Sequence, residues 1–266
     1  MIRLGVNTVL FSGFPLETAV DCIARAGYDG VELSAIAGMC EHLELDRWED
    51  QVDAIRSLLA DHGLAPLAME EARLDEDRLR KAFGAAQAIG IPVVNIGPGG
   101  KKDVEEDFVR QTDMMARMAD MAQAHGVVLC VKAHVGACIH DTPTTLRVMD
   151  RIASPHFGID MDPSHIYRAG ENPEEALPQV LSRVRHVHIR DCKGRGPSPG
   201  PIRDQACGRG DVDLPGYFRG MVAGGYDGPV DLEVIGAKDE DLTERTIIAA
   251  ESYGYMNACL EALGAR

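Results

Sequence analysis

Eight short apolar runs alternate along this chain with longer amphipathic runs, and this alternation constrains the fold more than any other feature. We expect the short runs to be strands, at residues 3–6, 30–33, 64–69, 91–97, 127–132, 157–162, 184–190 and 230–234. We expect helices at about 16–26, 47–62, 77–89, 105–125, 142–152, 173–182, 214–224 and 239–263. Each strand is followed by a crossover helix, which predicts a parallel sheet.

A parallel sheet of this kind can close into a barrel or stay open. The chain has 266 residues, which fits one barrel of roughly 250 residues. An open nucleotide-binding sheet carries a glycine-rich phosphate loop after its first strand, and this chain has none there. Gly97-Pro98-Gly99-Gly100 follows the fourth strand without a matching helix start. We therefore predict the α/β class and one (β/α)8 TIM barrel domain over residues 1–266.

The net charge and the cysteine content indicate which kinds of partner and which cellular compartment to expect. A formal net charge of -15 disfavours phosphate backbones and anionic membrane surfaces. No apolar stretch of about 18 residues is present, and residues 1–13 lack the long apolar run of a signal peptide. The seven cysteines form no Cys-x-x-Cys pair. We predict a cytoplasmic protein with a small-molecule partner, neither nucleic acid nor membrane; helix 239–263 can pack on the barrel or on a second subunit of a homo-oligomer.

Polar residues follow or end the last four predicted strands, where barrel enzymes carry their active sites. The fifth strand ends in Lys132 and His134, and the last three bring Asp162, His188 and Glu233 to adjacent strand ends. Two carboxylates and an imidazole suit a divalent ion such as Mn²⁺, Mg²⁺ or Zn²⁺. Such an ion can hold two neighbouring sugar oxygens and acidify the C–H bond between them. The alternative is that the carboxylates are merely solvated strand ends.

Five segments in order carry a family resemblance. They are Gly27-Tyr-Asp-Gly-Val-Glu32-Leu, Asp162-Pro-Ser-His165, His186-Val-His188-Ile-Arg-Asp191, Gly208-Arg-Gly-Asp-Val-Asp213 and Gly225-Tyr-Asp-Gly-Pro-Val-Asp-Leu-Glu233. With them the chain resembles the xylose isomerase-like barrels, a superfamily of sugar isomerases, ketose 3-epimerases and endonuclease IV. The resemblance implies a metal held by Glu, Asp, His and Glu on strands 5 to 8. The last three positions correspond to Asp162, His188 and Glu233.

The strand 5 position departs from the family pattern, because Lys132-Ala133-His134 stands where relatives have Glu-Pro-His. A charged lysine has no lone pair for a metal. In one outcome, which we expect, the metal stays on three protein ligands and Lys132 binds a substrate oxygen or acts as an acid or base. In the other, the ammonium of Lys132 replaces the charge of the metal, pairs with Asp162 and Glu233, and stabilises an enediolate. A structural salt bridge is a third role for Lys132.

Further residues are candidates for substrate binding. The resemblance places His134 near substrate, and a supporting or capping histidine is the alternative. It makes His165 a substrate contact or an additional metal ligand, as in endonuclease IV, and a histidine at a helix start is the alternative. Arg209 lies in segment 191–212, which we expect to cover the active site as a loop; a solvated arginine is the alternative. One of Glu32, Glu70 and Glu71 can supply the missing carboxylate, but Glu70 and Glu71 are adjacent and so cannot both face inward.

The predicted function is that of a sugar or keto-sugar isomerase or 3-epimerase. Glu233 would take the proton beside a carbonyl, and a metal ion or Lys132 would stabilise the enediolate. The first alternative is a keto-sugar dehydratase or lyase on the same site. A second is a non-catalytic partner subunit. A DNA-repair endonuclease is disfavoured by the acidic charge and by the small number of metal ligands.

Overall fold

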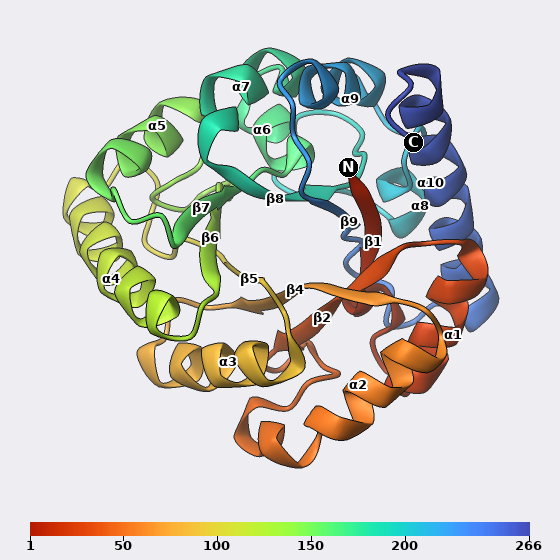
Figure 1. The fold of residues 1–266 in the computed structure, drawn as a ribbon. Helices are drawn as coiled ribbons and strands as arrows, with labels where there is room; N and C mark the ends of the chain where they lie inside the picture. Colours follow the sequence, from red (N-terminus) through yellow and green to blue (C-terminus); the bar gives the residue numbers. More distant parts are fainter.

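The computed structural model describes residues 1–266, and its strands close into a parallel barrel (Figure 1). The barrel strands are β1 (Arg3–Asn7), β2 (Gly30–Ile36), β4 (Ala65–Ala72), β5 (Val93–Ile96), β6 (Val128–Lys132), β7 (Phe157–Asp160), β8 (Val184–Ile189) and β9 (Pro229–Leu232). β1 pairs with both β9 and β2, which closes the barrel. The short β3 (Cys40–Glu41) is antiparallel to β2. The predicted (β/α)8 TIM barrel is therefore confirmed.

Helices surround the barrel as a ring (Figure 1). They are α1 (Leu16–Ala26), α2 (Val52–Asp61), α3 (Glu76–Ile89), α4 (Glu105–Ala124), α5 (Thr142–Arg151), α6 (Pro163–Ala169), α7 (Pro173–Val180), α8 (Ile202–Gln205), α9 (Leu214–Ala223) and α10 (Leu242–Ala262). Short 3₁₀ helices are η1 (Thr8–Phe11), η2 (Leu45–Asp50) and η3 (Leu181–Arg183). None of the helices combines the length and the apolar character that a membrane crossing requires.

Three helical regions differ from the sequence prediction, and one of them is the short α8, which was not predicted. The helix expected over 47–62 is split into η2 and α2, with a non-helical Arg47 inside η2. The sixth strand ends at Asp160, and a short helix that was not predicted, α6, starts at Pro163. Asp162 caps this helix, because its carboxylate accepts from the backbone N–H groups of Ser164 and His165. The proline at the first helical position favours the same start.

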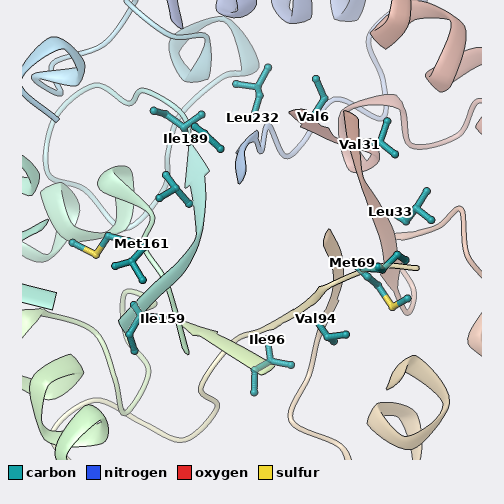
Figure 2. Close-up of a cluster of buried hydrophobic side chains, with 14 of the residues drawn as sticks. Val6, Val31, Leu33, Met69, Val94, Ile96, Ile159, Met161, Ile189 and Leu232 are labelled. Atoms are coloured by element: carbon teal, nitrogen blue, oxygen red, sulfur yellow. The ribbon is translucent and has the colours of Figure 1, made fainter. Parts of the chain in front are cut away.

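Apolar and polar side chains alternate along the barrel strands. Outward-facing residues such as Val6, Leu33, Met69 and Ile159 are buried between the strands and the helices (Figure 2). Their neighbours in sequence point inward and are polar; among them are Asn7, Glu32, Glu70, Asn95, Asp160, His188 and Glu233. Because strand side chains alternate between two faces, this pattern gives an apolar outer core and a polar upper interior.

Small residues make room for that polar interior. The lower interior contains the apolar cluster of Ala68, Val93 and Cys130. Gly5 faces Asp231, and a Cβ atom added there would lie 1.8 Å from Asp231 Oδ1. A glycine at this position therefore lets a carboxylate from β9 reach under the polar layer.

Segment 191–212 bridges the carboxyl ends of the barrel strands. Arg168 of α6 donates to the Pro197 carbonyl at 2.7 Å, and Gln205 Nε2 donates to the Ile235 carbonyl beyond β9 at 2.9 Å. The carboxylate of Asp191 accepts from the backbone N–H groups of Cys192, Gly208 and Val212, which holds the base of the segment together. These contacts place the segment between α6 and the chain that follows β9.

Candidate active site

The polar residues inside the barrel form two clusters, one above the other toward the carboxyl ends of the strands. The His186 cluster consists of His186, His188, Asp160, Asp231 and Glu32. The Lys132 cluster consists of Lys132, Glu70, Glu233, Arg190 and Asp162. All these residues are buried, with exposures of 0% to 4%.

The His186 cluster alternates imidazoles and carboxylates. His186 Nδ1 lies 2.9 Å from Asp160 Oδ1, and His186 Nε2 lies 2.7 Å from Asp231 Oδ2. His188 Nδ1 lies 2.6 Å from Asp160 Oδ2, and His188 Nε2 lies 2.5 Å from Glu32 Oε2. Each ring nitrogen therefore faces a carboxylate oxygen.

This pairing keeps both rings charged. Burial alone lowers the pKa of His186, but Asp160 and Glu32 raise it to about 9 overall. The same opposing causes raise the pKa of His188 well above its ordinary value. Burial raises the pKa of Asp160, yet His188 and His186 hold it well below its usual range. The cluster is thus a buried ion network.

Lys132 lies at the centre of the second cluster. Its Nζ donates to Glu233 Oε1 at 2.8 Å and to Glu70 Oε1 at 3.2 Å. Nζ also lies 3.1 Å from His188 Nδ1, but that nitrogen is closer to Asp160, so the contact is an approach of two donors. Burial lowers the pKa of Lys132, and Glu233 and Glu70 raise it above its ordinary value overall. Lys132 is therefore an ammonium group.

Arg190 is the second cation of this cluster. Its Nη2 donates to Asp162 Oδ2 at 3.0 Å, and its Nη1 lies 3.1 Å from Glu233 Oε2. Glu233 is thus placed between two cations. Asp162 accepts hydrogen bonds from Arg190 and from the backbone N–H groups at the start of α6. It has no hydrogen bond to Lys132 or His188, the residues with which the sequence analysis grouped it.

The two carboxylates on Lys132 differ in protonation. Burial raises the pKa of Glu70 to about 7, although Lys132 opposes the shift. Burial raises the pKa of Glu233 as well, but Arg190 and Lys132 lower it below its ordinary value overall. Glu70 also accepts from Asn7 Nδ2 at 2.7 Å, which orients its second oxygen. One buried carboxyl can therefore hold a proton near neutral pH while its neighbour is ionised.

Two groups of side chains bring possible metal ligands together. In the first, ligand atoms of Glu70, His188 and Glu233 lie within 4.8 Å of one another; in the second, those of Glu32, His186 and His188 do. The first group surrounds Lys132 Nζ, which contacts all three residues. In the second, both histidine rings have carboxylates at both nitrogens. As arranged here, neither group fits a divalent ion unless these side chains move.

His165 lies above Arg190, among donors. Arg190 Nη2 is 2.9 Å from His165 Nε2, while Arg168 Nη2 and the Val135 N–H lie 3.1 and 3.2 Å from Nδ1. Burial and Arg190 lower the pKa of His165 well below its ordinary value, so the ring is neutral. A neutral imidazole accepts at one nitrogen only. The donors around His165 therefore exceed the acceptors.

The other two residues predicted to bind substrate lie farther out. His134 is exposed and stacks on His165 with ring centroids 4.2 Å apart. Arg209 forms two bonds to Glu251 of α10, at 2.6 and 2.7 Å, and so points to the outer side of segment 191–212. The structure brings Lys132, Glu233 and His165 near one another through Arg190, but it does not bring Arg209 to them.

Several residues of the two clusters were not among the predicted site residues; they are Asn7, Asp160, His186, Arg190 and Asp231. Glu32 and Glu70 were expected only as alternatives for the missing carboxylate. Strand alternation contained a signal for three of them, because Asp160, His186 and Asp231 each precede a predicted ligand by two residues. Arg190 carried the same signal, because it follows His188 by two residues and so lies on the same face.

Comparisons with known proteins show the same fold. D-allulose 3-epimerase from Methylomonas sp. superposes with a TM-score of 0.76 at 18% identity, covering 97% of this chain and 98% of that one. The IOLI protein with a bound zinc atom superposes with a TM-score of 0.77 at 17% identity, covering 98% of both chains. At these identities the likeness concerns the fold alone.

In sequence, inosose dehydratase 2 of Bacillus cereus (strain ZK / E33L) is 27% identical over 89 residues, 34% of this chain. The match spans only 30% of the length of that relative. The family model described as xylose isomerase-like TIM barrel matches residues 20–258, most of the chain. The chain therefore belongs to the xylose isomerase-like TIM barrel family.

Proposed function

We propose that this protein is an epimerase or isomerase that moves a proton next to the carbonyl of a sugar-like ketone. The main support for this proposal is that two carboxyls contact Lys132 from different parts of the barrel. Glu70 belongs to β4, and Glu233 lies just after β9. Reversing a stereocentre requires one group to remove a proton and another to return it on the opposite face. Glu70 supplies the second carboxyl that Lys132 replaces on β6.

The two carboxyls have the protonation states that such a step needs. In this proposal Glu233, which is ionised, takes the proton from the carbon beside the carbonyl. Glu70, which has the raised pKa, gives a proton to the other face of the enediolate. The electron pair of the broken C–H bond moves onto the carbonyl oxygen, where Lys132 stabilises the negative charge.

The upper residues bind the substrate in this proposal. The surplus of N–H donors around His165 suits hydroxyl or carbonyl oxygens, which accept hydrogen bonds. Both Lys132 and Glu233 are almost fully buried, so substrate entry in this proposal requires the side chains or segments above them to move. Asp162 then holds α6 and Arg190 in place, and Arg209 approaches substrate only after it leaves Glu251.

A dehydratase is the second candidate, favoured by the similarity to inosose dehydratase 2. The same proton abstraction leads to loss of water when a hydroxyl group lies one carbon farther along. The protonated Glu70 would then give its proton to the leaving hydroxyl instead of to carbon. The two candidates share the first step and differ in what Glu70 protonates.

Proton exchange in heavy water tests the shared step. The protein is incubated with a panel of keto-sugars and cyclitol ketones, and deuterium incorporation next to the carbonyl is followed by NMR. We expect exchange with at least one substrate, together with either an epimer or an unsaturated ketone that absorbs in the ultraviolet. Glu233→Gln should slow the exchange by at least about 100-fold, and Glu71→Gln is the matched control because Glu71 faces Arg78 instead. A panel without any exchange would contradict the proposal.

A further inference from the structure

We propose that the ammonium group of Lys132 takes the place of a divalent metal ion in this barrel. Its Nζ lies 2.8 Å from Glu233, 3.2 Å from Glu70 and 3.1 Å from His188. These three residues form one of the two groups whose atoms are close enough to share a metal. An ion bound to all three would need the same space that Nζ occupies.

The carboxylates that the family pattern assigns to a metal are already paired with side-chain cations. Asp162 pairs with Arg190, which also approaches the second oxygen of Glu233. Arg190 is 1% exposed, and a guanidinium keeps its charge in any protein environment. Lys132 and Arg190 together therefore balance the two carboxylates that the family pattern assigns to a metal.

His188 gives the same indication independently of these cations. Both of its ring nitrogens face carboxylate oxygens, one on Asp160 and one on Glu32. A metal ligand needs a nitrogen lone pair directed at the ion, with only the other nitrogen held by a partner. A divalent ion would also have to lie beside a buried ammonium, which like-charge repulsion opposes.

The replacement leaves Lys132 able to bind an oxyanion. An ammonium group has three N–H donors, and two of them go to Glu70 and Glu233. The third is available for a substrate oxygen on which negative charge develops. This catalytic part rests on the proposed function, whereas the exclusion of a metal does not.

Binding of Mn²⁺ alone tests the inference on the full-length protein. The wild-type chain, Lys132→Glu and Lys193→Glu are titrated with Mn²⁺ and followed by calorimetry and by electron paramagnetic resonance. Lys193→Glu is the matched control, because it makes the same change of charge on segment 191–212, where Lys193 contacts Asp204. We expect one Mn²⁺ per chain in Lys132→Glu, bound at least about ten-fold more tightly than in the other two proteins.

Stoichiometric Mn²⁺ in the wild type that is unchanged in Lys132→Glu would overturn the inference. If Lys132→Glu does not fold, thermal unfolding of the wild type decides: a midpoint that neither Mn²⁺ nor EDTA shifts supports the inference, and a rise of several degrees with Mn²⁺ overturns it. Neither result depends on turnover. If no sugar in the panel reacts, the proposed function is contradicted, and Mn²⁺ binding still decides whether Lys132 replaces a metal.

Discussion

Both polar clusters inside the barrel combine buried carboxylates with buried cations, but the cations differ. In the His186 cluster each imidazole nitrogen faces a carboxylate, so its cations have no donor left. In the Lys132 cluster, Lys132 keeps one N–H free of carboxylates, and Glu233 Oε2 accepts no hydrogen bond although Arg190 is near. The lower cluster is therefore suited to stability and the upper one to binding a ligand.

The difference also separates what substitutions should do. A substitution in the His186 cluster leaves a buried charge without a partner, so it should lower stability and leave substrate contacts unchanged. A change in the Lys132 cluster alters groups that can meet substrate.

The largest effect is expected on catalysis, from the two carboxyls on Lys132. Glu233→Gln should slow solvent exchange of the substrate proton by about 10²–10⁴-fold, because the base is lost. In an epimerase, Glu70→Gln should slow epimer formation by a similar factor but keep exchange within about ten-fold, because Glu233 can still take and return a proton on one face. NMR in heavy water measures both rates.

Glu71→Gln serves as the control for Glu70→Gln, since it changes the neighbouring residue on the other face of β4. Equal losses of exchange and epimer formation in both Glu70→Gln and Glu233→Gln would contradict the division of roles. Loss of an unsaturated product in Glu70→Gln, with exchange kept, would instead favour the dehydratase.

The next largest effect is expected on stability, from the His186 cluster. Asp160→Asn removes a charge that faces both His186 and His188. We expect it to lower the free energy of unfolding by about 3–5 kcal/mol, the range for breaking a buried ion pair from one side. Glu233→Gln should cost less, because Lys132 keeps Glu70 and Arg190 keeps Asp162. Urea unfolding compares the two variants, and the reverse order would contradict the assignment of the clusters.

The outer fold could be predicted from the sequence because apolar periodicity reports directly which face of an element is buried. The strands of the barrel follow from such local patterns. The short helix α6 did not, because its seven residues are too few for a helical period and Asp162 can end a strand as well as cap a helix.

The partners inside the barrel could not be predicted from the sequence. Lys132 meets Glu70 and Glu233 across the barrel, at separations of 62 and 101 residues. Only the closure of the sheet sets these distances. The family pattern suggested Asp162 as a metal ligand, but it did not indicate that Asp162 pairs with Arg190. Glu70 was one of three candidates for the missing carboxylate, and alternation alone did not choose between Glu32 and Glu70, which both face inward.

A smaller effect is expected from pH, through His186. Burial lowers its pKa, but the carboxylates of Asp160, Glu32 and Asp231 raise the folded value to about 9, against 6.5 for an ordinary histidine. A raised pKa gives stability that is fully present below pH 6.5 and is lost as the pH rises through about 9. The loss should be on the order of 3 kcal/mol, from about 1.4 kcal/mol per pKa unit.

Urea unfolding at pH 7 and at pH 9.5 measures most of this loss. His186→Gln should flatten the dependence, although it also lowers stability at both pH values. His156→Gln should keep the wild-type dependence, since the ring of His156 bonds to the backbone carbonyl of Val127. An unchanged slope in His186→Gln would assign the pH dependence to another group.

The smallest effect is expected from Arg209, which joins neither cluster. Arg209→Ala removes an ion pair with Glu251 that is 40% exposed on the arginine side, so we expect a loss of only about 0.5 kcal/mol in unfolding free energy. Because its side chain points to α10, kcat and KM should stay within about two-fold of wild type, and Arg203→Ala, which breaks a similar contact with Glu244, should behave alike. A ten-fold rise in KM for Arg209→Ala alone would mean that segment 191–212 rearranges and brings Arg209 to the substrate. Arg209 would then join the Lys132 cluster in binding substrate, although in the present structure it lies outside that cluster.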